Sequence, residues 1–117
     1  MQTPLISILV PFKNTESYIV ECLDSIVQQT YSHWELIIID DGSTDASYQL
    51  VQNYANSDAR IHLLRNTGNG IIEALRTGYK LAKGTFVTRM DSDDVMALNK
   101  LEQMQQSLVT RGKVTWH

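Results

Sequence analysis

Two short acidic clusters carry the residues whose types and spacing favour chemistry. Six of the thirteen acidic residues lie within the segments DDGSTD at residues 40–45 and DSDD at residues 91–94. Carboxylates packed this closely need a cation, hydrogen-bond donors or solvent around them. Asp91 and Asp93 offer the hard oxygen ligands that Mg²⁺ and Mn²⁺ favour, and Mg²⁺ is typically shared between one or two carboxylates and substrate phosphates. The spacing therefore favours a divalent-cation site beside a phosphate, with a plain strand end and helix cap as the alternative.

Each acidic cluster directly follows an apolar run, and these runs have the pattern of strands. Strands are predicted at residues 5–10, 34–40, 61–64 and 85–90, with a fifth beginning at 114–116. Amphipathic helices are predicted between them, at about 15–29, 44–55, 71–82 and 97–110. Strands alternating with helices of this length indicate an α/β fold with a mostly parallel sheet of about four to five strands. Ligands of such sheets bind beyond the carboxyl ends of the strands, so both clusters are expected at the same edge.

The expected boundaries of these elements rest on a few residues. Pro11 is expected to stop the first strand, residues 14–15 to cap the following helix, and Gly84 to mark the end of the third helix. Helical spacing places Val27 on the apolar face of the first helix and Leu98 on that of the fourth.

The composition excludes several classes of protein. The 117 residues have the length of one domain, 43% are hydrophobic, 20% are charged, and the net charge is −3. An acidic chain without a basic run is a poor candidate for binding nucleic acid. No apolar run approaches the roughly 18 residues of a membrane span, and the N-terminus lacks the positive region of a signal peptide. The single cysteine, Cys22, falls on a predicted apolar helix face and is interpreted as a buried structural thiol, so the composition suits the cytosol.

The chain also carries a series of recognisable segments. They are ILVPFKN at 8–14, CLDSI at 22–26, QTY at 29–31, WELIIIDDGSTD at 34–45, and the stretch 84–94, which ends in MDSDD. In this order and spacing they resemble the nucleotide-sugar-binding half of a family 2 glycosyltransferase with the GT-A fold. The resemblance runs nearly from end to end of the chain. It implies a Rossmann-like sheet in which the second, first and fourth strands lie side by side.

The resemblance implies a mechanism and a set of site residues. Such enzymes move a sugar from a nucleotide diphosphate donor, often UDP-linked, to an acceptor hydroxyl with inversion at the anomeric carbon. By similarity, Asp40 hydrogen-bonds the base, Asp91 contacts the ribose or the metal, and Asp93 ligates the Mn²⁺ or Mg²⁺ that holds the diphosphate. The implied nucleotide-sugar site comprises Pro11, Phe12, Asn14, Asp40, Gly70, Asp91 and Ser92. The implied metal ligands are Asp93 and Asp91.

The chain departs from the family pattern in two ways. Arg76 stands in the third predicted helix where many relatives carry Asn, so no contact from this helix to sugar or phosphate is assigned. The family normally continues well past the fifth strand, into the part that carries the acceptor site and the catalytic base. Residues 1–117 are therefore interpreted as a single domain, the truncated N-terminal donor-binding portion of such an enzyme, with the base beyond His117. This fragment is expected to bind donor and metal without transferring sugar.

The principal alternative is a non-catalytic nucleotide-binding or interaction module. A receiver domain that accepts a phosphoryl group has similar length and strand-end acids, but it needs an acidic pair after the first strand, where this chain has Phe12 and Lys13. A nucleotidyltransferase of related fold needs a Gly-rich, Arg-containing loop there, which the sequence lacks. The expected partners are a UDP-sugar and a glycan or lipid-linked acceptor. The expected location is the cytoplasm, including the inner face of the membrane.

Overall fold

The computed structural model describes residues 4–111, and the side chains of residues 4–107. Its strands are β1 (Ile6–Phe12), β2 (Trp34–Asp40), β3 (Ile61–Arg65) and β4 (Phe86–Arg89), and its helices are α1 (Ile19–Val27), α2 (Ser47–Ser57), α3 (Ile71–Leu81) and α4 (Lys100–Arg111). The strands pair in parallel, in the order β3-β2-β1-β4. The predicted alternation, the parallel sheet and the adjacency of the second, first and fourth strands are confirmed. The fifth strand expected at 114–116 lies outside the described residues.

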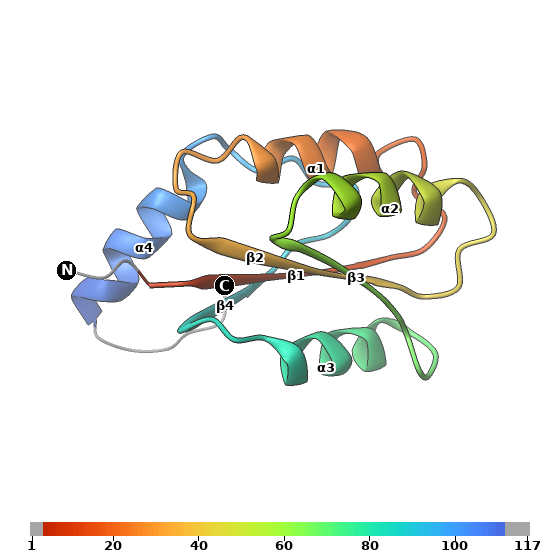
Figure 1. Ribbon diagram of the computed structural model, residues 1–117. Helices are drawn as coiled ribbons and strands as arrows, with labels where there is room; N and C mark the ends of the chain where they lie inside the picture. The colour runs from red at the N-terminus through yellow and green to blue at the C-terminus, as the bar shows by residue number, and fades with distance from the viewer. Residues whose placement is uncertain (1–3, 112–117) are drawn as a thin grey trace.

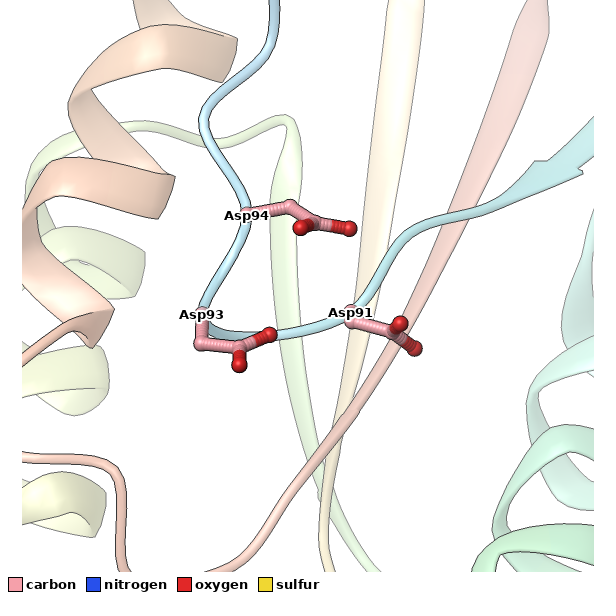
Figure 2. A group of neighbouring side chains, drawn as sticks. All are labelled: Asp91, Asp93 and Asp94. Carbon is pink, nitrogen blue, oxygen red and sulfur yellow. The ribbon is translucent and has the colours of Figure 1, made fainter.

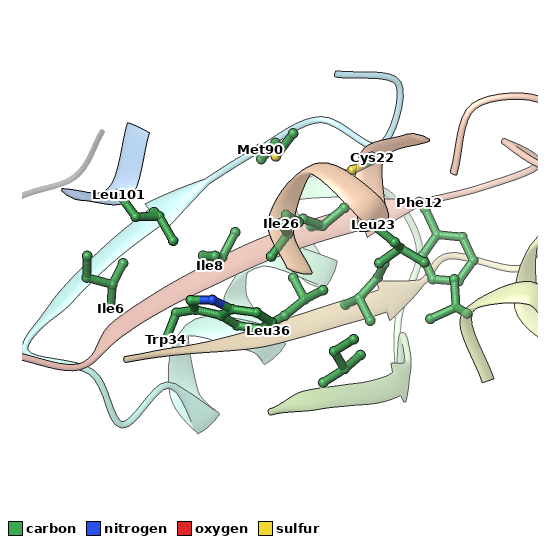
Figure 3. Close-up of a cluster of buried hydrophobic side chains, with 14 of the residues drawn as sticks. Ile6, Ile8, Phe12, Cys22, Leu23, Ile26, Trp34, Leu36, Met90 and Leu101 are labelled. Atoms are coloured by element: carbon green, nitrogen blue, oxygen red, sulfur yellow. The ribbon is translucent and has the colours of Figure 1, made fainter. Parts of the chain in front are cut away.

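Helices cover both faces of the sheet (Figure 1): α1 and α2 lie on one face and α3 on the other. β1 and β2 are buried along their whole length, because their side chains point alternately into two apolar clusters. The larger cluster joins Ile8 and Leu36 to α1, α2 and Leu101 of α4 (Figure 3). The smaller cluster sets Leu9 and Ile37 against α3. Apolar burial on both faces thus holds the sheet rigid and fixes where its strands end. Among the described residues, no helix is both long and apolar enough to cross a bilayer.

β1 runs through Pro11 to Phe12, so the expectation that Pro11 stops the strand is wrong. In a parallel sheet, the backbone groups of successive residues hydrogen-bond alternately to the strand on one side and to the strand on the other. Leu9 faces β4, because its carbonyl accepts from the Met90 N–H at 2.9 Å, and Pro11 therefore faces the same side. The pairing of β1 with β4 ends at Arg89. The missing N–H of Pro11 consequently removes no ladder hydrogen bond, and the strand continues.

α1 begins at Ile19, later than predicted, because residues 16–18 form a tighter turn in which the Tyr18 N–H donates to the Thr15 carbonyl at 2.9 Å. The Thr15 N–H donates to the Ser47 hydroxyl at 2.8 Å, and the Glu16 N–H donates to the Asp45 carboxylate at 3.3 Å. These bonds hold residues 15–16 against the loop that leads into α2. The expected cap at residues 14–15 is therefore wrong, since no side chain caps α1.

Three further expectations are corrected by the packing. Val27 is 37% exposed, because Ile26 already ends the buried stripe of α1, and Leu98 is 60% exposed in the turn that precedes α4. Gly84 lies beyond the end of α3 and does not cap it. Its N–H donates to Ser7 Oγ at 2.8 Å, and an added Cβ would lie 2.5 Å from that oxygen. Glycine is required there because the chain passes directly against β1.

Candidate functional site

A pocket of about 340 Å³ opens at the carboxyl edge of the sheet, beyond the ends of β1, β2 and β4. Its lining comes from the end of β1 and the loop after it, the residue after β2, the start of α3 and the turn after β4. These residues are Pro11, Phe12, Lys13, Asn14, Thr15, Tyr18, Asp41, Ile71, Asp91, Ser92 and Asp93. Both acidic clusters thus contribute to one pocket, as the edge argument predicts. Of the site residues expected from the sequence, all line this pocket except Asp40 and Gly70.

The acidic turn, residues 91–94, follows β4 and carries three exposed carboxylates. One oxygen each of Asp91, Asp93 and Asp94 lie within 4.8 Å of one another, and Figure 2 shows the three side chains grouped at this turn. The Asp94 N–H closes the turn by donating to the Asp91 carbonyl at 3.1 Å, and Ser92 is buried within it. Oxygen donors in this number and spacing suit a hard divalent cation such as Mn²⁺ or Mg²⁺. The turn therefore offers the two ligands expected from the sequence and adds Asp94 as a third candidate.

Asp40, the last residue of β2, is only 2% exposed and does not line the pocket. Its Oδ1 accepts from the Ser43 N–H at 2.9 Å and so fixes the loop after β2. Its Oδ2 is buried without a hydrogen-bond partner among the described residues, with the Arg65 guanidinium 3.7 Å away. Asp40 therefore shapes the loop after β2 and lies outside the pocket lining, whereas base binding by Asp40 is a prediction that the geometry does not test.

Asp41 is the carboxylate of this cluster that lines the pocket, and the sequence reasoning missed it. Its Oδ1 accepts from Asn66 Nδ2 at 2.8 Å and from the Gly70 N–H at 3.1 Å. Gly70 is thus tied to the site through Asp41, and its φ of +90° suits glycine at the start of α3. Strand alternation could not have separated Asp41 from Asp40, because residues of both parities are buried along β2.

Asn14 joins the loop after β1 to the loop after β2. Its Oδ1 accepts from the Thr44 N–H at 2.7 Å and from the Asp45 N–H at 3.2 Å. Its own N–H donates to Ser43 Oγ at 3.0 Å, and its φ of +52° lies in the left-handed region, which Asn tolerates better than most residues. Asn14 lines the pocket as predicted, but its carboxamide oxygen is engaged in holding the two loops together.

Cys22 lies beneath the acidic turn, with its thiol 3.8 Å from the Asp91 carbonyl. It is buried, as the sequence predicts. Burial, together with the negative charges of Asp94 and Asp93, raises the pKa of the Cys22 thiol from 9.0 to about 12. A thiol with this pKa stays protonated and is a packing residue, which leaves the carboxylates as the reactive groups of this region.

Comparisons with known proteins agree with this geometry. The sequence matches the glycosyl transferase family 2 over residues 7–115. WfgD of Escherichia coli, a UDP-Glc:alpha-D-GlcNAc-diphosphoundecaprenol beta-1,3-glucosyltransferase, is 38% identical over 117 residues, covering 99% of this chain and 45% of the relative. Among solved structures, residues 1–349 of S. aureus TarS in complex with UDP superimpose with a TM-score of 0.84 and 30% identity, covering 92% of this chain and 32% of that one. A Pyrobaculum calidifontis mannosyltransferase in complex with GDP-Man and Mn²⁺ superimposes with a TM-score of 0.73 and 29% identity, covering 80% of this chain and 29% of that enzyme.

The extent of these matches defines what they establish. The chain spans 15% to 47% of the length of the curated relatives it matches. The structural neighbours have the GT-A fold, and the sheet and helix layers described above are its nucleotide-binding half. The family match takes in both acidic clusters and nearly the whole sheet, which confirms the resemblance seen in the sequence segments. The chain belongs to glycosyl transferase family 2.

Proposed function

We propose that the protein containing this chain transfers a sugar from a UDP-sugar to an acceptor hydroxyl with inversion, and that residues 1–117 hold the donor. One observation carries the proposal: a single pocket has the Asp41 carboxylate and the Asp91 and Asp93 carboxylates on its walls. The related TarS binds UDP, and the E. coli relative is named for a UDP-Glc donor. Both facts support a UDP-linked donor for this pocket.

The acidic turn is proposed to hold a divalent cation, with Asp91 and Asp93 as ligands and Asp94 as a third candidate. When bound, Mn²⁺ or Mg²⁺ would neutralise charge on the leaving diphosphate. The donor set supports the assignment, since three carboxylate oxygens lie within 4.8 Å of one another. The Mn²⁺ in the related mannosyltransferase supports the same ion type. Ser92 contributes by packing inside the turn and keeping it closed.

Asp41 is proposed as the residue that recognises the nucleobase, in place of Asp40. Asn66 and Gly70 donate to Oδ1 of Asp41, so its Oδ2 is the oxygen left to accept from a ligand. A carboxylate oxygen accepts from the ring N–H that uracil and guanine carry and that adenine lacks. Tyr18 and Ile71, about half exposed on the lining, provide apolar surface against which a ring can pack. Pro11, Phe12 and Asn14 complete this part of the lining.

The remaining parts of the reaction are proposed to lie outside this chain. The base that takes the acceptor's proton is assigned to the part of the protein beyond His117, because the chain spans less than half the length of its relatives. A glycan or lipid-linked acceptor is proposed, since the E. coli relative is named for a diphosphoundecaprenol-linked acceptor. A lipid-linked acceptor would place the reaction at the inner face of the membrane. The 117-residue chain by itself is expected to bind without turnover.

Calorimetric titration of the 117-residue chain with UDP, GDP and ADP, with and without Mn²⁺, tests the proposal. We expect UDP to bind at least about tenfold more tightly with Mn²⁺ than without it, and ADP to bind weakly in both conditions. Asp93→Ala should abolish the gain from Mn²⁺, and Asp41→Asn should weaken UDP binding without removing that gain. Lys80→Gln, an exposed change on α3 away from the pocket lining, is the control. A folded chain that binds none of the nucleotides in the presence of Mn²⁺ contradicts the proposal.

A further inference from the structure

We propose that Arg89 is a built-in counter-ion of the acidic turn, which weakens the binding of a divalent cation alone and makes that binding depend on the donor's diphosphate. The inference rests on the proposed function, because it takes Asp91 and Asp93 as the metal ligands. It adds a role for a residue of β4 that the donor pocket itself does not include.

The position of Arg89 is set by the sheet. It is the last residue of β4 and pairs with Leu9 of β1, and the next residue continues that ladder through a 2.9 Å bond to the Leu9 carbonyl. From this fixed point its Nη2 donates to Oδ1 of Asp91 at 3.0 Å. Among residues 4–107, this is the one ion pair that any of the three acids of the turn makes. The guanidinium therefore approaches the cluster at the carboxylate nearest to the strand.

The charges of this arrangement favour competition between Arg89 and a metal ion. Three carboxylates repel one another at these distances, and the positive charge of the guanidinium offsets one of their charges. A divalent cation bound at the turn would share Asp91 with the guanidinium and would be repelled by it. Because both side chains of the pair are about half exposed, solvent screens this repulsion and keeps it moderate. Arg89 is expected to weaken metal binding without preventing it.

The donor changes this balance. A nucleotide diphosphate brings its own negative charges to the turn, and a guanidinium matches phosphate oxygens as well as it matches a carboxylate. With the diphosphate present, the repulsion between Arg89 and the metal is offset by attraction of both to the same anion. Arg89 therefore couples the two ligands: it disfavours the metal alone and favours the metal together with the diphosphate.

Mn²⁺ titrations by calorimetry, or by the electron paramagnetic resonance of free Mn²⁺, test this role on the 117-residue chain with and without saturating UDP. For Arg89→Gln we expect about 3- to 10-fold tighter binding of Mn²⁺ alone, since one repelling charge is removed. The ratio of Mn²⁺ affinities with and without UDP should fall by a similar factor. Arg89→Lys keeps the charge and should stay close to wild type. Arg76→Gln removes an equally charged, exposed arginine that pairs with Glu73 on α3, and it should change neither quantity.

The outcomes separate this inference from the proposed function. If the wild-type chain binds no Mn²⁺ even with UDP, the metal site is wrong and the role of Arg89 falls with it. If wild type binds Mn²⁺ and Arg89→Gln binds it equally or more weakly, only the counter-ion role is overturned. Weaker binding in that variant would instead make Arg89 a residue that orients Asp91. Equal changes in Arg89→Gln and Arg76→Gln would reduce the effect to net charge and also overturn the inference.

Discussion

The two edges of the sheet treat acidic residues in opposite ways. At the amino edge, Glu35 is 7% exposed, and its Oε2 accepts from the Ser7 hydroxyl and the Lys83 N–H, each at 2.6 Å. Ser7 Oγ in turn accepts from Gly84, so each donor in this network has an acceptor. At the carboxyl edge, the carboxylates of residues 91–94 are exposed and face one another. Folding supplies Glu35 with two hydrogen-bond donors. At the carboxyl edge, among the described residues, Asp91 has Arg89 as an ion-pair partner, whereas Asp93 and Asp94 have none.

The difference teaches how a structural acid is told from a functional one. Burial alone does not decide the matter, because Asp40 is as buried as Glu35 yet has one oxygen without a hydrogen-bond partner among the described residues. What distinguishes the edges is whether the fold supplies the donors. Glu35 should therefore matter for stability and little for ligand binding, whereas the acids of the turn should show the reverse.

At neutral pH, the largest expected effect of a substitution is on the amino edge, from Gly84→Ala. The added Cβ would lie 2.7 Å from Ser7 N and 2.8 Å from the Leu5 carbonyl oxygen, both backbone atoms that cannot move aside. We expect the free energy of unfolding to fall by about 3 kcal/mol, measured by urea denaturation. Lys83→Ala, an exposed neighbour, should change it by less than about 0.5 kcal/mol. A fully stable Gly84→Ala chain would show that the edge can open, and that the contact between Gly84 and β1 is not tight.

Glu35→Ala should follow, with a loss of about 2 kcal/mol, because the Ser7 hydroxyl and the Lys83 N–H would lose their acceptor in a buried place. The affinity of the folded fraction for UDP should stay unchanged, since this network lies at the edge opposite the pocket. Glu73→Ala, at an exposed acid paired with Arg76 on α3, is the matched control and should cost a few tenths of a kcal/mol. If Glu35→Ala and Glu73→Ala lose the same unfolding free energy, the buried hydrogen bonds of Glu35 do not stabilise the fold more than an exposed ion pair does.

The same contrasts show which features of the molecule can be predicted from its sequence. The strands, the helices and the shared edge of the two acidic clusters follow from local apolar periodicity and were predicted. The grouping of carboxylates in the turn at residues 91–94 was predicted too, since its acidic residues are adjacent in sequence. Contacts between segments that are distant in the sequence were not predicted. Gly84 meets Ser7 across 77 positions and Asn14 meets Thr44 across 30, and no local pattern encodes either contact.

A medium effect is expected at Asn14, where the two loops of the pocket meet. Asn14→Ala loses the acceptor for two N–H groups and also strains a left-handed backbone, so we expect a loss of about 1–2 kcal/mol of stability and weaker UDP binding. Asn14→Gly keeps the backbone geometry and separates the two causes, and Asn14→Asp keeps the acceptor oxygen. Unfolding curves rank the three variants by stability, and UDP titrations rank them by affinity. If Asn14→Gly matches wild type in both, the carboxamide does not join the loops.

A pH-dependent effect is expected at Cys22. Below pH 9 the thiol is protonated in both the folded and unfolded states and adds no pH dependence. Between pH 9 and about 12 the unfolded thiol ionises while the folded one, with its raised pKa, does not. Stability should therefore fall by about 1.4 kcal/mol per pH unit in this range. The difference in unfolding free energy between wild type and Cys22→Ala isolates this slope, because the raised pKa of Tyr54 acts equally in both. A difference that stays flat above pH 9 would contradict the raised thiol pKa.

The smallest effect has the opposite sign and returns to the carboxyl edge. Asp93→Asn removes one of three like charges whose oxygens lie within 4.8 Å of one another, so stability without metal should rise by a few tenths of a kcal/mol at low salt. The gain should disappear at high salt, because screening already weakens the repulsion. Saturating Mn²⁺ and UDP should reverse the order, since ligands that bind only the folded chain stabilise wild type more than the variant. Thermal melts of both chains in these three conditions measure the gain, its loss at high salt, and its reversal by the ligands. A variant less stable than wild type in metal-free, low-salt buffer would place Asp93 with Glu35 among the acids that the fold satisfies.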